Sequence, residues 1–252
     1  MRGIFWCFLL MAAVFAPRAA AAKTLTVAVE EISYLPYHGF QNGNFVGFAQ
    51  KLLAAWAEAR GDSLSFEPIS VKRHVEALAE PGIDLVWPDN PAWRIDEKAA
   101  LGRPVRYSGI VISGLKGVLV LHREHPLSVA QVTALGTIIG FGNDMARLGI
   151  DTQDKQMIET RSLESLVEML AANRVDGIFC DLHAAEYELR QQKQNVGFTL
   201  DFAAGSPRSE SPYRLSTAAR PDLIEDFDAW FARNTPTVER LTKEAFRAGG
   251  AS

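Results

Sequence analysis

The sequence of 252 residues contains only two cysteines, Cys7 and Cys180. Cys7 lies in an apolar N-terminal run, and Cys180 ends the apolar segment 175–180, where we expect a strand with a buried thiol. Without the N-terminal run, one cysteine remains, so an internal disulfide is excluded although export would permit one. No cysteine and histidine residues show the spacing of a zinc site. The sequence therefore predicts neither a metal nor a cofactor.

Long basic runs and long apolar runs are missing too. No basic run could follow a phosphate backbone, so nucleic acid is not an expected partner. The apolar run at residues 4–16 is shorter than the about 20 residues that a membrane-spanning helix needs. It follows Arg2 and precedes small residues up to Ala22, the pattern of a secretory signal. We expect residues 1–22 to be a signal peptide, cleaved near Ala22, and the protein to reach the periplasm; an uncleaved anchor is the alternative.

Removal of the signal peptide also removes Arg2 and Arg18, which leaves 24 basic residues against 30 acidic ones, a net charge of −6. The remaining 230 residues, 23–252, suit one large domain or two small lobes.

The pattern of residues 23–87 predicts strands and helices in alternation. Strands are expected at 23–29, 64–70 and 83–87, with a long loop at 30–44. Helices are expected at 46–61, where Leu53 and Trp56 share a stripe and Gly61 ends the helix, and at 72–80. This order predicts a parallel sheet covered by helices.

A second α/β series begins after residue 115. Strands are expected at 117–124, 136–141, 155–160 and 175–180. Helices are expected at 127–135, with Ser128 as its cap, from 143, at 162–174, with Ser162 as its cap, and at 181–192. The tail is expected to form helices at 221–234 and 237–248. If it packs back on the first unit, the chain crosses between lobes near 109–117 and 203–212, where Gly, Ser and Pro are frequent.

Several segments together resemble the family 3, amino-acid-binding type of periplasmic solute-binding protein of ABC transporters. They are NGNFVGFAQKLLAAWAEARG at 42–61, IDLVWPDNPAWR at 83–94, PVRYSG at 104–109, GVLVLHRE at 117–124 and RVDGIFCDLHAAEY at 174–187. The resemblance implies an α/β, two-lobed periplasmic-binding-protein type II fold, each lobe a sheet covered by helices, with two crossover connections and ligand in the cleft. It places residues 23–112 and 208–252 in lobe 1 and residues 113–207 in lobe 2.

The resemblance also implies roles for individual residues. Arg94 matches the arginine that clamps a ligand carboxylate, for which a guanidinium offers two parallel hydrogen bonds. Asp181 matches the aspartate that receives an α-amino group, and it would also cap the helix at 181–192. Tyr34 matches the aromatic loop that covers ligand, as Tyr37 does less clearly, and Glu31 matches an acid that meets a ligand side chain.

The chain departs from the family pattern at two loops. Trp87 and Asp89 stand where hydroxyl residues are usual. Asp89 could pair with Arg94, meet a cationic ligand group beside the face of Trp87, or cap the following helix. In the second lobe Asn143 can offer an amide, while Asp144 would repel an anion.

Three functions stay open at this point. The first is periplasmic binding of a small polar solute, amino-acid-like or related, for an inner-membrane ABC permease. The second is an orphan receptor that reports to a membrane sensor. The third is an enzyme resembling cyclohexadienyl dehydratase, which needs an acid or base in the cleft. We expect a monomeric, non-enzymatic protein with a small-molecule ligand.

Overall fold

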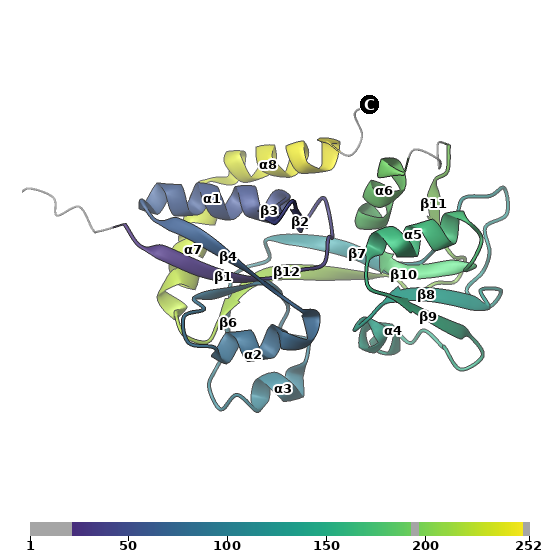
Figure 1. Ribbon diagram of the computed structural model, residues 1–252, viewed down its shortest axis with the longest axis horizontal. Helices are drawn as coiled ribbons and strands as arrows, with labels where there is room; N and C mark the ends of the chain where they lie inside the picture. The colour runs from purple at the N-terminus through teal and green to yellow at the C-terminus, as the bar shows by residue number, and fades with distance from the viewer. Residues whose placement is uncertain (1–21, 193–196, 249–252) are drawn as a thin grey trace, which may run out of the picture.

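The computed structural model describes residues 22–192 and 197–248, so the predicted signal peptide lies almost wholly outside the described residues. Figure 1 shows two lobes, with the N-terminal strands in one and the chain from about 130 to 200 in the other. Two strands, β7 (Ile112–Leu121) and β12 (Ser209–Thr217), run between them. Within the described residues, no helix is both long and apolar enough to cross a membrane.

The first lobe contains the predicted parallel sheet. Strand β1 (Thr24–Glu30) pairs in parallel with β4 (Ser63–Ile69) on one side and with β5 (Leu85–Asp89) on the other. Helices α1 (Phe48–Arg60) and α2 (His74–Ala79) connect these strands, and a short 3-10 turn at Val71–Arg73 precedes α2. The β-α-β-α-β order read from the sequence is therefore confirmed.

Helix α1 shows why its sequence pattern was informative. Leu52, Leu53 and Trp56 are buried, and Gly61 ends the helix with φ 74° in the left-handed region. The segment before it was expected to be a loop, but it also contains a hairpin of β2 (Gly39–Gln41) and β3 (Asn44–Val46). With strands of three residues each, the hairpin is too short to show an alternating pattern.

The second lobe repeats the parallel arrangement. Strand β8 (Ala134–Ile138) pairs in parallel with β9 (Gln156–Thr160) and with β10 (Gly177–Asp181). The helices are α4 (Gly142–Arg147), α5 (Leu163–Ala171) and α6 (Leu182–Gln191), and β11 (Leu200–Phe202) pairs with β7. Ser162 caps α5 and Asp181 caps α6 through side-chain oxygens, as predicted. Cys180 is fully buried, which raises the pKa of its thiol, so the inert thiol expected there is present.

The helix predicted at 127–135 is wrong. Residues 129–131 form turns, and Ala134 already begins β8. Two tertiary contacts replace the helical hydrogen bonds: Lys155 Nζ donates to the carbonyls of Val129 and Val132, and Val129 N donates to Ala204 O. The β-branched residues here favour helix weakly, so tertiary context decides.

The C-terminal tail returns to the first lobe. Helices α7 (Pro221–Arg233) and α8 (Thr235–Ala248) both contact α1, and Figure 1 shows α8 along it. Trp56 Nε1 donates to Asp226 at 2.9 Å across this contact. Strand β12 pairs with β7 through Ser209–Tyr213 and with β5 through Arg214 and Ser216, so one strand joins both lobes. The exact lobe boundaries stay a prediction.

Candidate functional site

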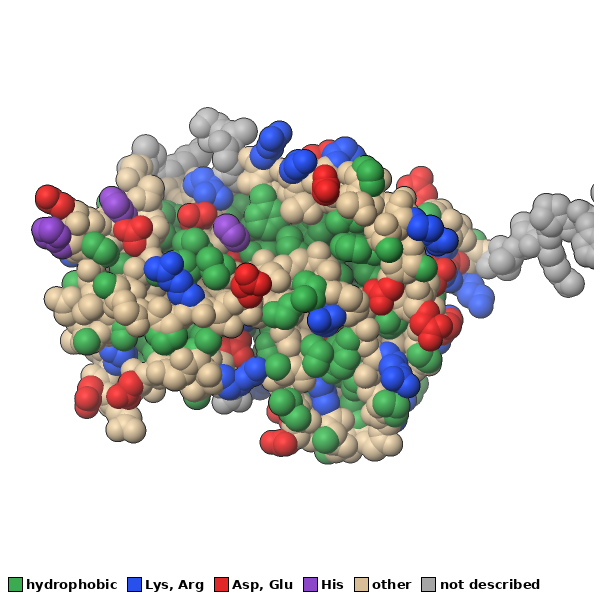
Figure 2. Space-filling model, turned by 180° about the vertical axis from the view of Figure 1, so that it is seen from behind, with side chains coloured by type: hydrophobic (Ala, Val, Ile, Leu, Met, Phe, Trp, Pro, Cys, Tyr) green, Lys and Arg blue, Asp and Glu red, His purple; other side chains and the backbone are tan. Residues whose placement is uncertain are grey.

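A cavity with a volume of about 510 Å³ takes its lining from both lobes. The first lobe contributes the ends of β1 and β5, the start of α2 and the loop into α3 (Ile95–Ala99). The second lobe contributes Lys116 of β7 and the loop and helix at 140–147. Figure 2 shows an indentation at the lower edge where the two halves meet, with basic and acidic side chains near it. A cavity at the carboxyl ends of parallel strands is the usual ligand position in open α/β sheets.

Aromatic rings form much of the cavity wall. Tyr34, Trp93 and Tyr213 come from the first-lobe side, and Phe141 comes from the second lobe. The centroids of Trp93 and Tyr213 are 5.9 Å apart, and those of Tyr34 and Phe141 are 6.0 Å apart. Such rings offer a ligand large apolar faces at a small cost in side-chain entropy.

Lys116 is a buried cation at the junction of the lobes. Its Nζ donates to Asp144 Oδ2 at 2.9 Å and lies 5.2 Å from the ring centroid of Trp93 and 4.6 Å from that of Phe141. Because Trp93 belongs to one lobe and Phe141 to the other, the ammonium group contacts both sides of the cavity. Cation–π attraction of this kind is strongest where water is excluded.

Arg94 lines the mouth of the cavity. It precedes α3 with φ 48° and ψ 47°, a left-handed conformation that is uncommon for a residue other than glycine. Its side chain pairs with Glu97 at 3.1 Å and not with Asp89. Arg147 of the second lobe also lines the cavity, and its Nη1 donates to Ala92 O, a hydrogen bond between the lobes.

A buried network of charges lies under one wall. Asp89 is fully buried and accepts hydrogen bonds from Lys98 Nζ and from Ser216 Oγ. The ring of His74 lies between two carboxylates, 3.3 Å from Glu30 and 3.2 Å from Asp89, as ion pairs without aligned hydrogen bonds. Burial alone would lower the pKa of His74, but Asp89 and Glu30 together raise it to about 9. Glu30 and His74 face the cavity, whereas Asp89 and Lys98 lie behind them.

His38 is the second histidine on this wall. It is 2% exposed, and neither ring nitrogen has a hydrogen-bond partner among the described residues. Burial lowers the pKa of His38 to about 4, against a smaller opposite effect of Glu30, so the imidazole is neutral at physiological pH. Two histidines on one wall therefore hold opposite protonation states.

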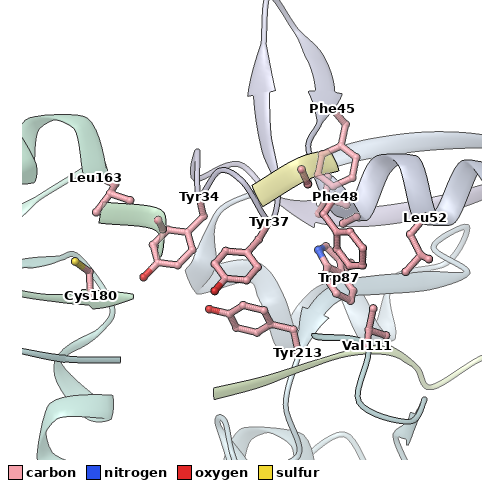
Figure 3. Packing of buried hydrophobic residues seen from close by; sticks show 14 of the residues in the cluster. Tyr34, Tyr37, Phe45, Phe48, Leu52, Trp87, Val111, Leu163, Cys180 and Tyr213 are labelled. Carbon is pink, nitrogen blue, oxygen red and sulfur yellow. The ribbon is translucent and has the colours of Figure 1, made fainter. Parts of the chain in front are cut away.

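Asp181 lies behind the tyrosine rings and not at the cavity surface. Its carboxylate accepts hydrogen bonds from the backbone of Ala184 and Leu115, and its own N–H donates to Tyr34 Oη at 2.9 Å. Figure 3 shows the hydroxyl groups of Tyr34, Tyr37 and Tyr213 directed towards the side of Cys180, the residue before Asp181. Burial raises the pKa of Asp181.

The residues predicted from the sequence thus fall into separate places. Tyr34 and Arg94 line the cavity. Glu31 is exposed, while its neighbour Glu30 faces the cavity. Trp87 and Asp89 are buried in the first lobe, Trp87 with its ring edge towards Tyr213. Asn143 is in α4, but its side chain lies outside the described residues.

Sequence reasoning missed His38, His74, Lys116 and Phe141 as cavity residues. His74 lies in a predicted helix and Lys116 in a predicted crossover segment. The sequence pattern alone does not distinguish either residue from one that is exposed to solvent. Among the described residues, no group of three His, Cys, Asp or Glu side chains is placed to hold a metal ion. The cavity can bind a small molecule through aromatic faces, charges of both signs and a neutral imidazole.

Several solved structures of low sequence identity have the same fold. An ABC uptake transporter substrate-binding protein from Streptococcus pneumoniae with bound histidine is 17% identical, with a TM-score of 0.71 over 88% of this chain and 92% of that one. A Salmonella typhimurium periplasmic binding protein described as highly specific for arginine is 18% identical, with a TM-score of 0.69 over 89% and 100%. An ancestral amino-acid-binding protein, described as a precursor of cyclohexadienyl dehydratase, is 16% identical, with a TM-score of 0.68 over 88% and 95%.

These likenesses confirm the two-lobed periplasmic-binding-protein fold that the resemblance implied. No protein-family model and no curated protein matches the chain.

Proposed function

We propose that this protein is a periplasmic receptor that binds a small polar, amino-acid-like solute between its lobes and delivers it to an ABC importer. The observation that carries this proposal is the cavity of about 510 Å³, which takes aromatic and charged side chains from both lobes. Its volume is within the range of about 300–1,000 Å³ found for small-molecule sites. The proteins of the same fold support the proposal, because one contains bound histidine and another is described as highly specific for arginine.

The arrangement also suggests how binding is reported. Lobes joined by two strands can close on a ligand, and a permease can recognise the closed form. The contact between Arg147 and Ala92 and the contacts of Lys116 with both lobes are interactions that closure would form. The apolar N-terminal run and the expected cleavage near Ala22 support a periplasmic location for this receptor.

In this proposal Arg94 and Tyr34 contact the ligand. Arg94 keeps a guanidinium at the cavity mouth, where its one ion pair, with Glu97, can yield to a ligand carboxylate. Tyr34 presents a ring whose orientation is fixed by the hydrogen bond from Asp181 N. The protein binds without turnover; dehydration of a cyclohexadienyl acid by the purified protein would contradict this part of the proposal.

A thermal-shift screen of residues 23–252 tests the proposal, with amino acids, polyamines, betaines, organic acids and aromatic acids as ligands. A ligand at one hundred times its Kd stabilises the folded state by about 2.7 kcal/mol, which raises the Tm of a domain of this size by roughly 5–11 °C. Isothermal titration would then give the Kd of each hit.

Two tryptophan variants locate the hit. Ala146 is exposed and lines the cavity, so Ala146→Trp fills the cavity without entering the core. Ala59 is an exposed residue of α1 outside the cavity lining, and Ala59→Trp is the matched control. We expect the shift to persist in the control and to vanish in Ala146→Trp. Equal shifts in both variants, or no shift with any compound, would contradict a solute site in this cavity.

A further inference from the structure

We infer that His38 and Glu30 form the subsite that receives the hydrogen-bond-donating group of the ligand, while the Asp181 carboxylate holds the backbone of α6 and β7 in place and contacts no ligand. The inference rests on the proposed function. It specifies the ligand chemistry: a group with at least two N–H or O–H donors, such as an ammonium, a guanidinium or neighbouring hydroxyls.

The first observation concerns the hydrogen bonding of the His38 ring. A buried polar group without a partner costs about 1–3 kcal/mol, and native structures hold few such groups. Both ring nitrogens of His38 lack a partner among the described residues, and the ring lines the cavity. A neutral imidazole has one acceptor nitrogen and one donor nitrogen. A ligand in the cavity can supply the missing hydrogen bond to the acceptor nitrogen.

The second observation concerns Glu30, which supplies a second hydrogen-bond acceptor to the cavity that His38 lines. Glu30 lines the same cavity, is 8% exposed, and acts on the pKa of His38 through its charge. Glu30 Oε1 pairs with His74, and no described donor reaches Oε2. One carboxylate oxygen and one imidazole nitrogen therefore accept from the same region of the cavity. A ligand group with two donors satisfies both, whereas a carboxylate satisfies neither.

The third observation is that hydrogen bonds within the first lobe hold the loop that carries His38. Tyr34 N donates to His38 O at 2.7 Å, which closes the turn, and the rings of the two residues stack at 6.1 Å. The first amides of α1 donate to this loop, Phe48 N to Pro36 O and Ala49 N to Tyr37 O, both at 2.9 Å. A fixed first-lobe subsite binds its ligand group with little loss of entropy.

The carboxylate of Asp181 accepts hydrogen bonds from backbone groups of the protein. One carboxylate oxygen caps α6 through Ala184 N, and the other accepts from Leu115 N of β7. A Cβ atom on Gly114 would lie 2.6 Å from Asp181 Oδ2 and 3.0 Å from Tyr213 Oη, so the aspartate is enclosed by β7 and a tyrosine ring. A ligand in the cavity would have to displace packed tyrosine rings to reach it.

Isothermal titration with four probes tests the inference. L-arginine carries a guanidinium and a carboxylate, agmatine carries a guanidinium without the carboxylate, and myo-inositol carries only hydroxyl donors. Glycine betaine carries a carboxylate but no N–H or O–H donor. We expect binding by at least one donor-bearing probe and none by glycine betaine. The probe that binds identifies whether N–H or O–H donors are recognised.

The same titrations use three variants. His38→Phe keeps a ring but removes both hydrogen-bonding atoms, and we expect it to weaken binding about tenfold or more. His38→Gln keeps a donor and an acceptor and is expected to stay within about threefold of the wild type. Asp181→Asn keeps the acceptor that caps α6 but turns an NH2 donor towards Leu115 N, so we expect a lower Tm while the affinity stays within about twofold.

A stability measurement separates a ligand role of His38 from a structural one. Because neither ring nitrogen of His38 has a hydrogen-bond partner among the described residues, and Phe keeps a ring to stack on Tyr34, the Tm of ligand-free His38→Phe is expected to equal or exceed that of the wild type. Three outcomes would overturn this inference while leaving the proposed function intact. They are wild-type affinity in His38→Phe, tight binding of glycine betaine, and a loss of affinity in Asp181→Asn as large as that in His38→Phe. Silence of the wild type with every solute would refute the proposed function and this subsite together.

Discussion

Asp89→Asn tests whether the buried charge network stabilises the fold or binds the ligand. The substitution keeps the size and removes one charge from a fully buried carboxylate. Lys98 Nζ then loses its anionic partner, and His74 keeps only Glu30 at 3.3 Å. Ser216 Oγ can still donate to the remaining oxygen. Removal of one partner from a buried ion pair leaves an uncompensated buried cation, which costs about 3–5 kcal/mol. For a domain of this size, the Tm falls by roughly 6–20 °C.

Urea unfolding and thermal melting of the ligand-free protein measure the loss. The control is the double variant Asp89→Asn, Lys98→Met, which removes the stranded ammonium along with the carboxylate. We expect it to recover part of the lost stability, because an apolar side chain needs no partner. A loss below about 1 kcal/mol in the single variant would refute the reasoning, since that is the size of a solvent-exposed pair. Abolished binding with unchanged stability would instead make Asp89 a ligand contact.

Three further variants or conditions follow from the same contacts. Arg94→Ala should abolish binding of carboxylate ligands while the Tm falls by no more than about 2–4 °C, because its one pair is with exposed Glu97; titration with unchanged affinity would remove Arg94 from the site. Gly47→Ala should lower the free energy of unfolding, measured in urea, more than Gly61→Ala does. Both glycines have positive φ, but only at Gly47 would a Cβ atom meet backbone atoms, at 3.0 Å from His38 Cα and from Tyr37 O. Equal losses of stability would contradict this reasoning. His74 should make the free energy of unfolding fall by roughly 3 kcal/mol between about pH 6.5 and pH 9. Its folded-state pKa is raised, so its contribution is full below pH 6.5 and lost as pH rises through 9; a flat profile in urea melts would contradict the pairing.

The sequence predicted most of the fold because its elements carry local signals. Helix α1 has an apolar stripe and a terminal glycine, and α5 and α6 begin at Ser162 and Asp181, whose side chains cap them. The parallel pairing of β1 with β4 and β5 follows from the alternation of strands and helices. The prediction of a helix at 127–135 was wrong because the β-branched residues there favour helix only weakly. Lys155 donates to carbonyl groups of this segment, and an amide of the segment donates to Ala204 O.

The candidate site was less predictable, because a residue's neighbours in the cavity come from distant parts of the chain. The pattern at 30–34 placed an acid near the site, but β1 ends at Glu30, which lines the cavity, and Glu31, just after the strand, is exposed. Asp89 carried the same local signal as a ligand-binding acid. Only the position of Lys98 nine residues later and of Ser216 on β12 made it part of a buried network.

By itself, then, the sequence determined the α/β class of the fold, the alternation of strands and helices along the chain and most helix ends, because spacing and capping act over a few residues. The tertiary structure decided which polar groups are satisfied within the protein and which face the cavity. The Asp181 carboxylate accepts from Leu115 N and Ala184 N, whereas the buried ring nitrogens of His38 have no hydrogen-bond partner in the part of the chain that the structure describes. The free energy of a buried polar group depends on atoms far away in sequence, and the packed lobes alone bring those atoms together.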